Sequence, residues 1–241
     1  MNENRCEPIL GVLGGMGALA SAEFVRSIYE SAPPGPEQSS PIVALYSDPT
    51  FPDRTEAFLR GAGEDLRERL LDALARLRRL GASRMVLCCM TLHHLVPDLP
   101  REVRDEIIPL PDVIFTRVQQ SAARHLLLCS TGSRKLNLFE DHPDWDRSKD
   151  RILFPDDGDQ TRLHELIFEI KENRGVAAML AFIESLLSKY RIDSFIAGCS
   201  ELHIVAKRLN ADPTRGKRYG CVDPFAILAR DWAEGRFRGI R

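Results

Sequence analysis

The sequence predicts an α/β protein with parallel strands and helices on both faces of the sheet. Short runs rich in Val, Ile and Leu recur along the chain without polar alternation, which is typical of strands buried on both faces. Amphipathic stretches with helical spacing separate these runs. Such alternation favours strand–helix–strand units, in which neighbouring strands are parallel.

Six apolar runs are expected to form strands, at residues 9–15, 41–47, 84–90, 125–132, 193–200 and 218–224. Four stretches are expected to form helices, at residues 55–81, 112–125, 175–190 and 224–235. The first of these helices carries leucines at helical spacing and is expected to stop at Gly81.

The chain divides into two halves. Residues 1–113 are expected to form a first α/β lobe, and residues 114–208 a second one. The tail, residues 209–241, offers a short strand and a helix that are expected to return to the first lobe. No Pro- or Ser-rich linker separates the halves, so we expect tightly packed lobes with a cleft between them.

Composition excludes several classes of protein. The chain has 241 residues, 44% of them hydrophobic and 28% charged, with a formal net charge of -2, so no basic nucleic-acid surface is expected. No apolar run approaches the length of a membrane span, and the N-terminal residues do not resemble a secretory signal. The expected compartment is the cytoplasm.

The chain has six cysteines, and a cytosolic protein keeps them as reduced thiols. They are Cys6, Cys88, Cys89, Cys129, Cys199 and Cys221. There is no CxxC pair, and no acidic or histidine cluster matches His93 and His94, so no metal site is expected.

Ligands of open parallel sheets bind beyond the carboxyl ends of the strands. The first strand ends in a turn, residues 14–17, whose backbone N–H groups could meet an anion. The third ends at Cys89, and the runs ending in residues 130–133 and 198–201 carry hydroxyls and Cys199.

Cys89 and Cys199 occupy equivalent settings, each before an expected helix start, where the helix dipole lowers the pKa of a thiol. Two thiols that face each other across a cleft can remove a proton from a carbon atom and return it on the opposite side. Buried cysteines are also common in cores. The residues alone leave core packing and catalysis about equally open.

Four motifs occur in order along nearly the whole chain: "ILGVLGGMGALASAEF", "FPDRTEAFL", "LCCMTLHHL" and "IAGCSELHIV". Together they resemble the aspartate/glutamate racemase superfamily, in its aspartate racemase branch. The resemblance implies two Rossmann-like lobes related by a pseudo-two-fold axis, with the active site between them. It also implies a homodimer and a small amino-acid or dicarboxylate substrate.

By motif position, the resemblance implies cofactor-independent racemisation by Cys89 and Cys199, while Cys88 should point into the core. It implies a substrate-binding set that comprises Met16, Arg54, Met90, Thr91, Thr131, Ser133, Lys171, Ser200 and Glu201. Arg54 matches the arginine that holds a substrate carboxylate through two parallel hydrogen bonds. For Lys171 a solvated helix charge is an equal alternative, and Glu201 could simply favour a helix start.

One residue departs from the family motif. Met90 stands where the family has asparagine, and methionine offers no amide donor to an amino-acid substrate. Three functions therefore stay open: an aspartate or glutamate racemase, a family enzyme for another small carboxylate (an isomerase or a decarboxylase), and a binding homologue. The retained thiol pair and motifs favour the first. There is no P-loop and no GxGxxG spacing, so no cofactor is expected.

Overall fold

The computed structural model describes residues 8–236, so Cys6 lies outside the described residues. Two parallel sheets form the framework, which confirms the α/β fold class. The first sheet, in the order β2–β1–β3, contains β1 (Ile9–Gly14), β2 (Val43–Ser47) and β3 (Ala82–Leu87). The second, in the order β5–β4–β6–β7, contains β4 (His125–Cys129), β5 (Ile152–Leu153), β6 (Ser194–Gly198) and β7 (Gly220–Val222). In each sheet the earliest strand is flanked by the next two, one on either side.

Helices connect the strands. The first half contains α1 (Ala18–Glu30), α2 (Arg54–Leu59), α3 (Gly63–Arg79), α4 (Arg101–Arg104) and α5 (Leu110–Gln119). The second half contains α6 (Thr131–Lys135), α7 (Trp145–Ser148), α8 (Asp157–Lys171), α9 (Val176–Tyr190), α10 (Glu201–Ala211), α11 (Arg215–Arg218) and α12 (Pro224–Ala233). Three 3-10 helices are η1 (Glu37–Ser39), η2 (Met90–Asp98) and η3 (Lys149–Arg151). Within residues 8–236, no helix is long and apolar enough to cross a membrane.

The structure differs from the expected elements in several places, and the long helices α1 and α8 lie outside the four expected helical ranges. The expected helix at 55–81 is divided into α2 and α3, because Gly61 between them adopts a left-handed conformation with a φ of 77°. The two-residue strand β5, which pairs with the start of β4, was not expected, since its sequence is too short to show a pattern. The other expected strands and helices occur, most of them a few residues shorter.

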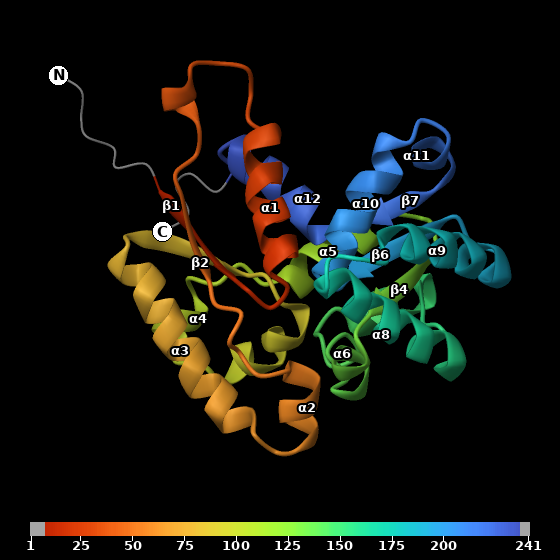
Figure 1. Cartoon of the computed structure of the whole chain (residues 1–241), viewed down its shortest axis with the longest axis horizontal. Coiled ribbons are helices and arrows are strands. Elements are labelled where there is room, and N and C mark those ends of the chain that lie inside the picture. Colours follow the sequence, from red (N-terminus) through yellow and green to blue (C-terminus); the bar gives the residue numbers. More distant parts are fainter. Residues whose placement is uncertain (1–7, 237–241) are drawn as a thin grey trace.

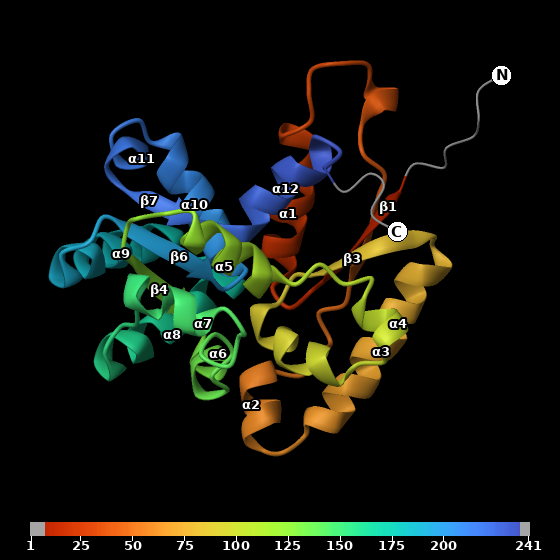
Figure 2. The same cartoon turned by 180° about the vertical axis from the view of Figure 1, so that it is seen from behind.

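The two sheets share one apolar core. Figures 1 and 2 show α1, α5 and α12 between the sheets, while α3 covers the outer face of the first sheet and α8 and α9 cover that of the second. The central core contains residues of both halves, such as Val12 and Phe24 with Leu127 and Phe225. Two further apolar clusters lie under the outer helices. The two sheets are therefore packed together through a shared core.

The tail does not return as a unit to the first lobe. Strand β7 pairs in parallel with β6, so it extends the second sheet, and this part of the expected boundary is wrong. Helix α12 packs against α1 and against α5. The edge of β6 that does not pair with β4 is free to form hydrogen bonds, and β7 pairs with it. The apolar face of α12, in contrast, packs into the central core. The division at residues 113 and 208 stays a prediction.

Candidate active site

A small cavity lies where the carboxyl ends of strands from both sheets meet. Nine of the eleven site residues expected from the sequence line it. They are Met16, Arg54, Cys89, Met90, Thr91, Lys171, Cys199, Ser200 and Glu201. The cavity is also lined by four residues that sequence reasoning missed, namely Asp53, Thr55, Ser130 and Phe168. Asp53, Thr55 and Ser130 adjoin expected motif residues, whereas no motif points to Phe168.

The adjacent cysteines after β3 point in different directions. Cys89 has an extended backbone, with φ -154° and ψ 108°, so its side chain and that of Cys88 emerge on opposite sides. Cys88 is fully buried in the central core, and burial raises its pKa well above the ordinary value. Cys89 lines the cavity and is 5% exposed. Of the two thiols, only Cys89 is therefore placed to meet a ligand there.

Cys199, which follows β6, is joined to Glu201 inside the cavity. The Cys199 thiol donates a hydrogen bond to Oε2 of Glu201 over 2.9 Å, and the Ser200 hydroxyl donates to the same oxygen over 3.0 Å. Glu201 is 1% exposed, and its Oε1 has no hydrogen-bond partner among the described residues. Gly17 permits this approach, because a Cβ there would lie 2.1 Å from Oε1.

The pKa of Cys199 lies well above its ordinary value, so the expectation of a lowered pKa is wrong for this thiol. Burial is the largest cause, and the negative charge of Glu201 adds to it, while Lys171 opposes both. The dipole of α10 does act in the expected direction, but it is weaker than desolvation and a directly bonded carboxylate. Cys199 is therefore a protonated thiol near neutral pH.

Arg54, the first residue of α2, carries a buried guanidinium at the cavity. Its Nη1 donates to the carbonyl oxygen of Pro52 over 2.9 Å, and its Nη2 donates to that of Met16 over 3.4 Å. Among residues 8–236, its Nε has no partner and no carboxylate is hydrogen-bonded to the guanidinium. Burial lowers its pKa, but the negative charges of Cys89 and of nearby carboxylates outweigh burial and raise it. Arg54 is thus a cation that still has a hydrogen-bond donor available for an anionic partner.

Three hydroxyl groups link the two halves beside the cavity. The Thr91 hydroxyl lies 3.1 Å from that of Ser130 and 3.0 Å from that of Ser133. Ser130 also caps α6 by accepting a hydrogen bond from the N–H of Ser133. Ser133 is fully buried, and neither it nor Thr131 lines the cavity, so Ser130 occupies the place expected for them.

Lys171 contributes a cation to the cavity wall, and Met90 contributes an apolar side chain. Lys171 ends α8, and its Nζ lies 4.2 Å from the ring centroid of Phe168, which favours a cation–π contact. Met90 is 1% exposed and belongs to the central apolar core as well as to the cavity wall. At the position where the family motif has the amide of asparagine, the wall of this cavity is therefore apolar.

His93 supports the backbone of Cys89. Its Nε2 accepts a hydrogen bond from the N–H of Leu110 over 3.2 Å, so the proton lies on Nδ1, which donates to the carbonyl oxygen of Cys89 over 3.2 Å. Burial lowers the pKa of His93 to about 4. The neighbouring His94 packs edge-on against Phe58. Both histidines thus have packing roles, and neither lines the cavity.

In the turn after β1, the backbone N–H of Gly15 already has a hydrogen-bond partner within the protein. The N–H of Gly15 donates to the hydroxyl of Ser21 over 3.3 Å, so it is not free to meet an anion. Gly15 has a φ of 95°, and a Cβ there would lie 2.3 Å from the backbone of Asp48. The glycines of this turn therefore serve close packing.

The cavity is nearly closed. It leaves about 10 Å³ for the centre of a water-sized molecule, which is the room that about one water needs. Cys89 and Cys199 are 5% and 7% exposed. Side chains or whole lobes must therefore move apart before a molecule of amino-acid size can enter.

Solved structures with the same fold carry racemase names. An aspartate racemase from Picrophilus torridus superposes with a TM-score of 0.78 and 19% identity, over 94% of each chain. A glutamate racemase from Francisella tularensis in complex with D-glutamate gives 0.60 and 14%, over 96% of this chain and 81% of the other. An allantoin racemase from Klebsiella pneumoniae gives 0.60 and 14%, over 96% and 88%. Identities this low show the fold alone.

The family model of the Asp/Glu/Hydantoin racemases matches residues 13–231. The match covers most of the chain, from the first strand to the last helix, and it includes every residue that lines the cavity. It supports a racemase-type enzyme. This protein belongs to the Asp/Glu/Hydantoin racemase family.

Proposed function

We propose that this protein is a cofactor-independent racemase of an acidic amino acid, with Cys89 and Cys199 as its two acid/base groups. The observation that carries the proposal is that one cavity contains both thiols together with a buried arginine to which no carboxylate of the described residues is hydrogen-bonded. Arg54 would hold the substrate carboxylate through parallel N–H···O bonds, which fixes the α-carbon relative to the thiols.

The reaction needs no net proton uptake. One sulfur, as thiolate, takes the α-proton and becomes a thiol, which leaves the electron pair of the C–H bond on the α-carbon and its carboxylate. The guanidinium of Arg54 stabilises this developing negative charge. The opposite thiol then donates its proton to the other face of the α-carbon and becomes a thiolate. The configuration is inverted, and the two thiols have exchanged protonation states.

The neighbours of each sulfur suggest which of the two acts first. Cys199 lies against the carboxylate of Glu201, which favours the neutral thiol. Cys89 lies in the field of the cationic Arg54. We therefore propose that Cys89 removes the first proton and that Cys199 supplies the second. Glu201 keeps the proton on Cys199 until the carbanion forms.

Deuterium exchange tests the proposal. The enzyme is incubated with L- and D-aspartate and with L- and D-glutamate in deuterated water, and products are separated by chiral chromatography and mass spectrometry. Inverted product should carry one α-deuterium. Cys89→Ala and Cys199→Ala should each lower inversion by about 10²–10⁴-fold, because each removes one acid/base group. Cys88→Ala is the matched control and should invert the substrate as the parent does. Absence of α-deuterium with all four substrates would reject the acidic amino acids.

Met90 favours a second candidate, a family enzyme for a different small carboxylate or ring-containing substrate. An apolar wall suits a substrate that presents fewer polar groups on that side. The same deuterium assay with allantoin and other hydantoin-like compounds separates this candidate from the first. Loss of α-proton exchange with every class would leave a binding homologue. Assembly as a homodimer and location in the cytoplasm stay predictions.

A further inference from the structure

A second hollow, of about 590 Å³, lies at the end of the second sheet opposite the cavity with the cysteines. Its floor contains the first residues of β4, β6 and β7, namely His125, Ser194 and Gly220. Ser130 and Cys199 follow the other ends of β4 and β6. The hollow therefore has no residue in common with the candidate active site.

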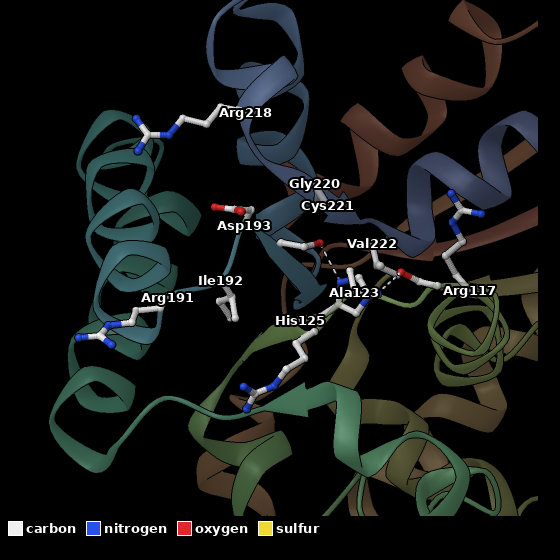
Figure 3. A pocket seen from close by; sticks show the side chains of 13 residues that line it. Arg117, Ala123, His125, Arg191, Ile192, Asp193, Arg218, Gly220, Cys221 and Val222 are labelled. Atoms are coloured by element: carbon white, nitrogen blue, oxygen red, sulfur yellow. Dashed lines mark hydrogen bonds between the residues drawn. The ribbon is translucent and has the colours of Figure 1, made fainter.

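Four arginines surround this hollow. Arg117 comes from α5, Arg124 precedes β4, Arg191 follows α9 and Arg218 ends α11. Figure 3 shows Arg117 on one side of the hollow and Arg191 and Arg218 on the other, with His125 between them. The side chains of Arg191 and Arg218 extend away from His125, so segments far apart in the sequence contribute positive charges around the rim of one hollow.

These arginines lack acidic partners. Within the part of the chain that the structure describes, none of the four forms an ion pair, whereas Arg215, on the same helix as Arg218, pairs with Glu184 over 2.9 Å. Asp193 is the one acidic residue among those that line the hollow. Three helices end near the hollow, and their dipoles favour arginine there. Each helix end carries only about half a charge, so an excess of positive charge remains.

The floor contains a polar group that also lacks a partner. His125 is 3% exposed, and its Nδ1 lies 2.7 Å from the hydroxyl of Ser194. Its Nε2 is buried without a hydrogen-bond partner among the described residues. Such a group is costly unless a ligand or water satisfies it. Nε2 is covered by neighbouring atoms, so these would have to move before an oxygen of a bound anion could accept a hydrogen bond from the Nε2–H tautomer.

We propose that this hollow binds a small metabolite that carries two or more phosphate or carboxylate groups. Arginine is the side chain best suited to hold such groups, through paired N–H donors in a fixed plane. The volume suits a molecule of metabolite size. No Phe, Tyr or Trp side chain is among the lining residues, and the ring of His125 is 3% exposed, so the site offers little stacking surface for a nucleotide base.

Calorimetric titration of the whole protein tests this site, with pyrophosphate and with citrate as separate probes. At least one probe should bind with one site per chain, and its affinity should weaken between low and physiological salt. Tighter binding of pyrophosphate identifies phosphate as the preferred group, and tighter binding of citrate identifies carboxylate. Binding must persist in Arg54→Gln, because the site is separate from the cavity with the cysteines.

Arg191→Gly is the decisive variant. Arg191 has a φ of 54°, a left-handed conformation that glycine adopts without strain, so the variant should fold at least as well as the parent. Affinity should fall several-fold in this variant, and about tenfold or more when Arg124→Gln and Arg218→Gln are added. Arg101→Gln is the matched control, because Arg101 lies on α4 and its side chain is 84% exposed. This variant should bind the probe with the affinity of the parent.

Three results would overturn the proposal. The first is no binding of either probe at millimolar concentration. The second is equal weakening by Arg191→Gly and Arg101→Gln, which would indicate only nonspecific attraction. The third is binding of duplex nucleic acid or of an acidic peptide when neither small anion binds.

Discussion

The Cys199 thiol and the Glu201 carboxylate form a hydrogen-bonded pair, with 2.9 Å between Sγ and Oε2, in a cavity with room for about one water. A buried carboxylate next to a thiol disfavours the thiolate, because two negative charges would then face each other without solvent. The pair therefore makes the two cysteines unequal before any substrate enters. Cys89 has a guanidinium as its neighbour, and Cys199 has a carboxylate.

Replacing Glu201 with glutamine should lower the pKa of Cys199. Because burial, not Glu201, is the largest cause of the raised pKa, the value should stay above the ordinary one. The thiolate absorbance of Glu201→Gln, compared with that of the Glu201→Gln/Cys199→Ala double variant over a pH series, isolates this thiol. Racemisation should fall by about tenfold or more, and its pH profile should shift to lower pH. An unchanged titration of Cys199 would show that Glu201 has no such role.

Replacing Arg54 with glutamine should weaken binding of any substrate carboxylate. Hydrogen bonds to charged groups contribute about 1.5–3 kcal/mol, so the Kd or KM should rise about 10- to 150-fold. Arg67→Gln is the control, since Arg67 pairs with Glu64 on α3, away from the cavity. Steady-state kinetics and titration with a dicarboxylate analogue measure both variants. Equal affinities of Arg54→Gln and the parent would remove Arg54 from the binding site.

Replacing Met90 with asparagine should raise activity toward aspartate and lower stability. The amide supplies a donor to the substrate, but Met90 also packs in the central core, where a polar group costs about 1–3 kcal/mol. Met90→Leu conserves volume without a donor, so it should keep stability within about 1.5 kcal/mol and gain no activity. Chemical unfolding and kcat/KM are measured together. A gain in Met90→Leu as large as in Met90→Asn would mean that the donor is irrelevant.

His93 should make the fold sensitive to mild acid. A histidine in the unfolded chain titrates near 6.5 and the buried one near 4, so the unfolded chain takes up a proton first as the pH falls. The stability associated with the neutral ring is complete above pH 6.5 and is lost as the pH falls to about 4, by up to about 3 kcal/mol.

His93→Gln isolates this effect. Glutamine can accept from Leu110 and donate to Cys89 as the histidine does, yet it does not titrate. Urea unfolding at several pH values should show a smaller acid loss for His93→Gln than for the parent. Parallel curves for the two proteins would mean that His93 is protonated in the folded state or is not the titrating group.

Much of the fold was predictable because its signals are local. Strands β4 and β6 are buried along their whole length, which requires the uninterrupted apolar runs that the sequence displays. The break between α2 and α3 was missed, although Gly61 marks it, because glycine in a helical pattern does not always interrupt the helix. The pairing of β7 with β6 was missed because a three-residue strand carries no information about its partner.

The sequence by itself determined the α/β class, the strand ends that carry chemistry, and nine of the residues that line the cavity. Only the tertiary structure decided that Ser130 replaces Thr131 and Ser133 in the cavity, that Glu201 binds the Cys199 thiol, and that four distant arginines share one hollow. Motifs and apolar periodicity record which residues occur near one another along the chain. A pKa, a hydrogen bond and a charge cluster depend on distances between segments that only packing brings together.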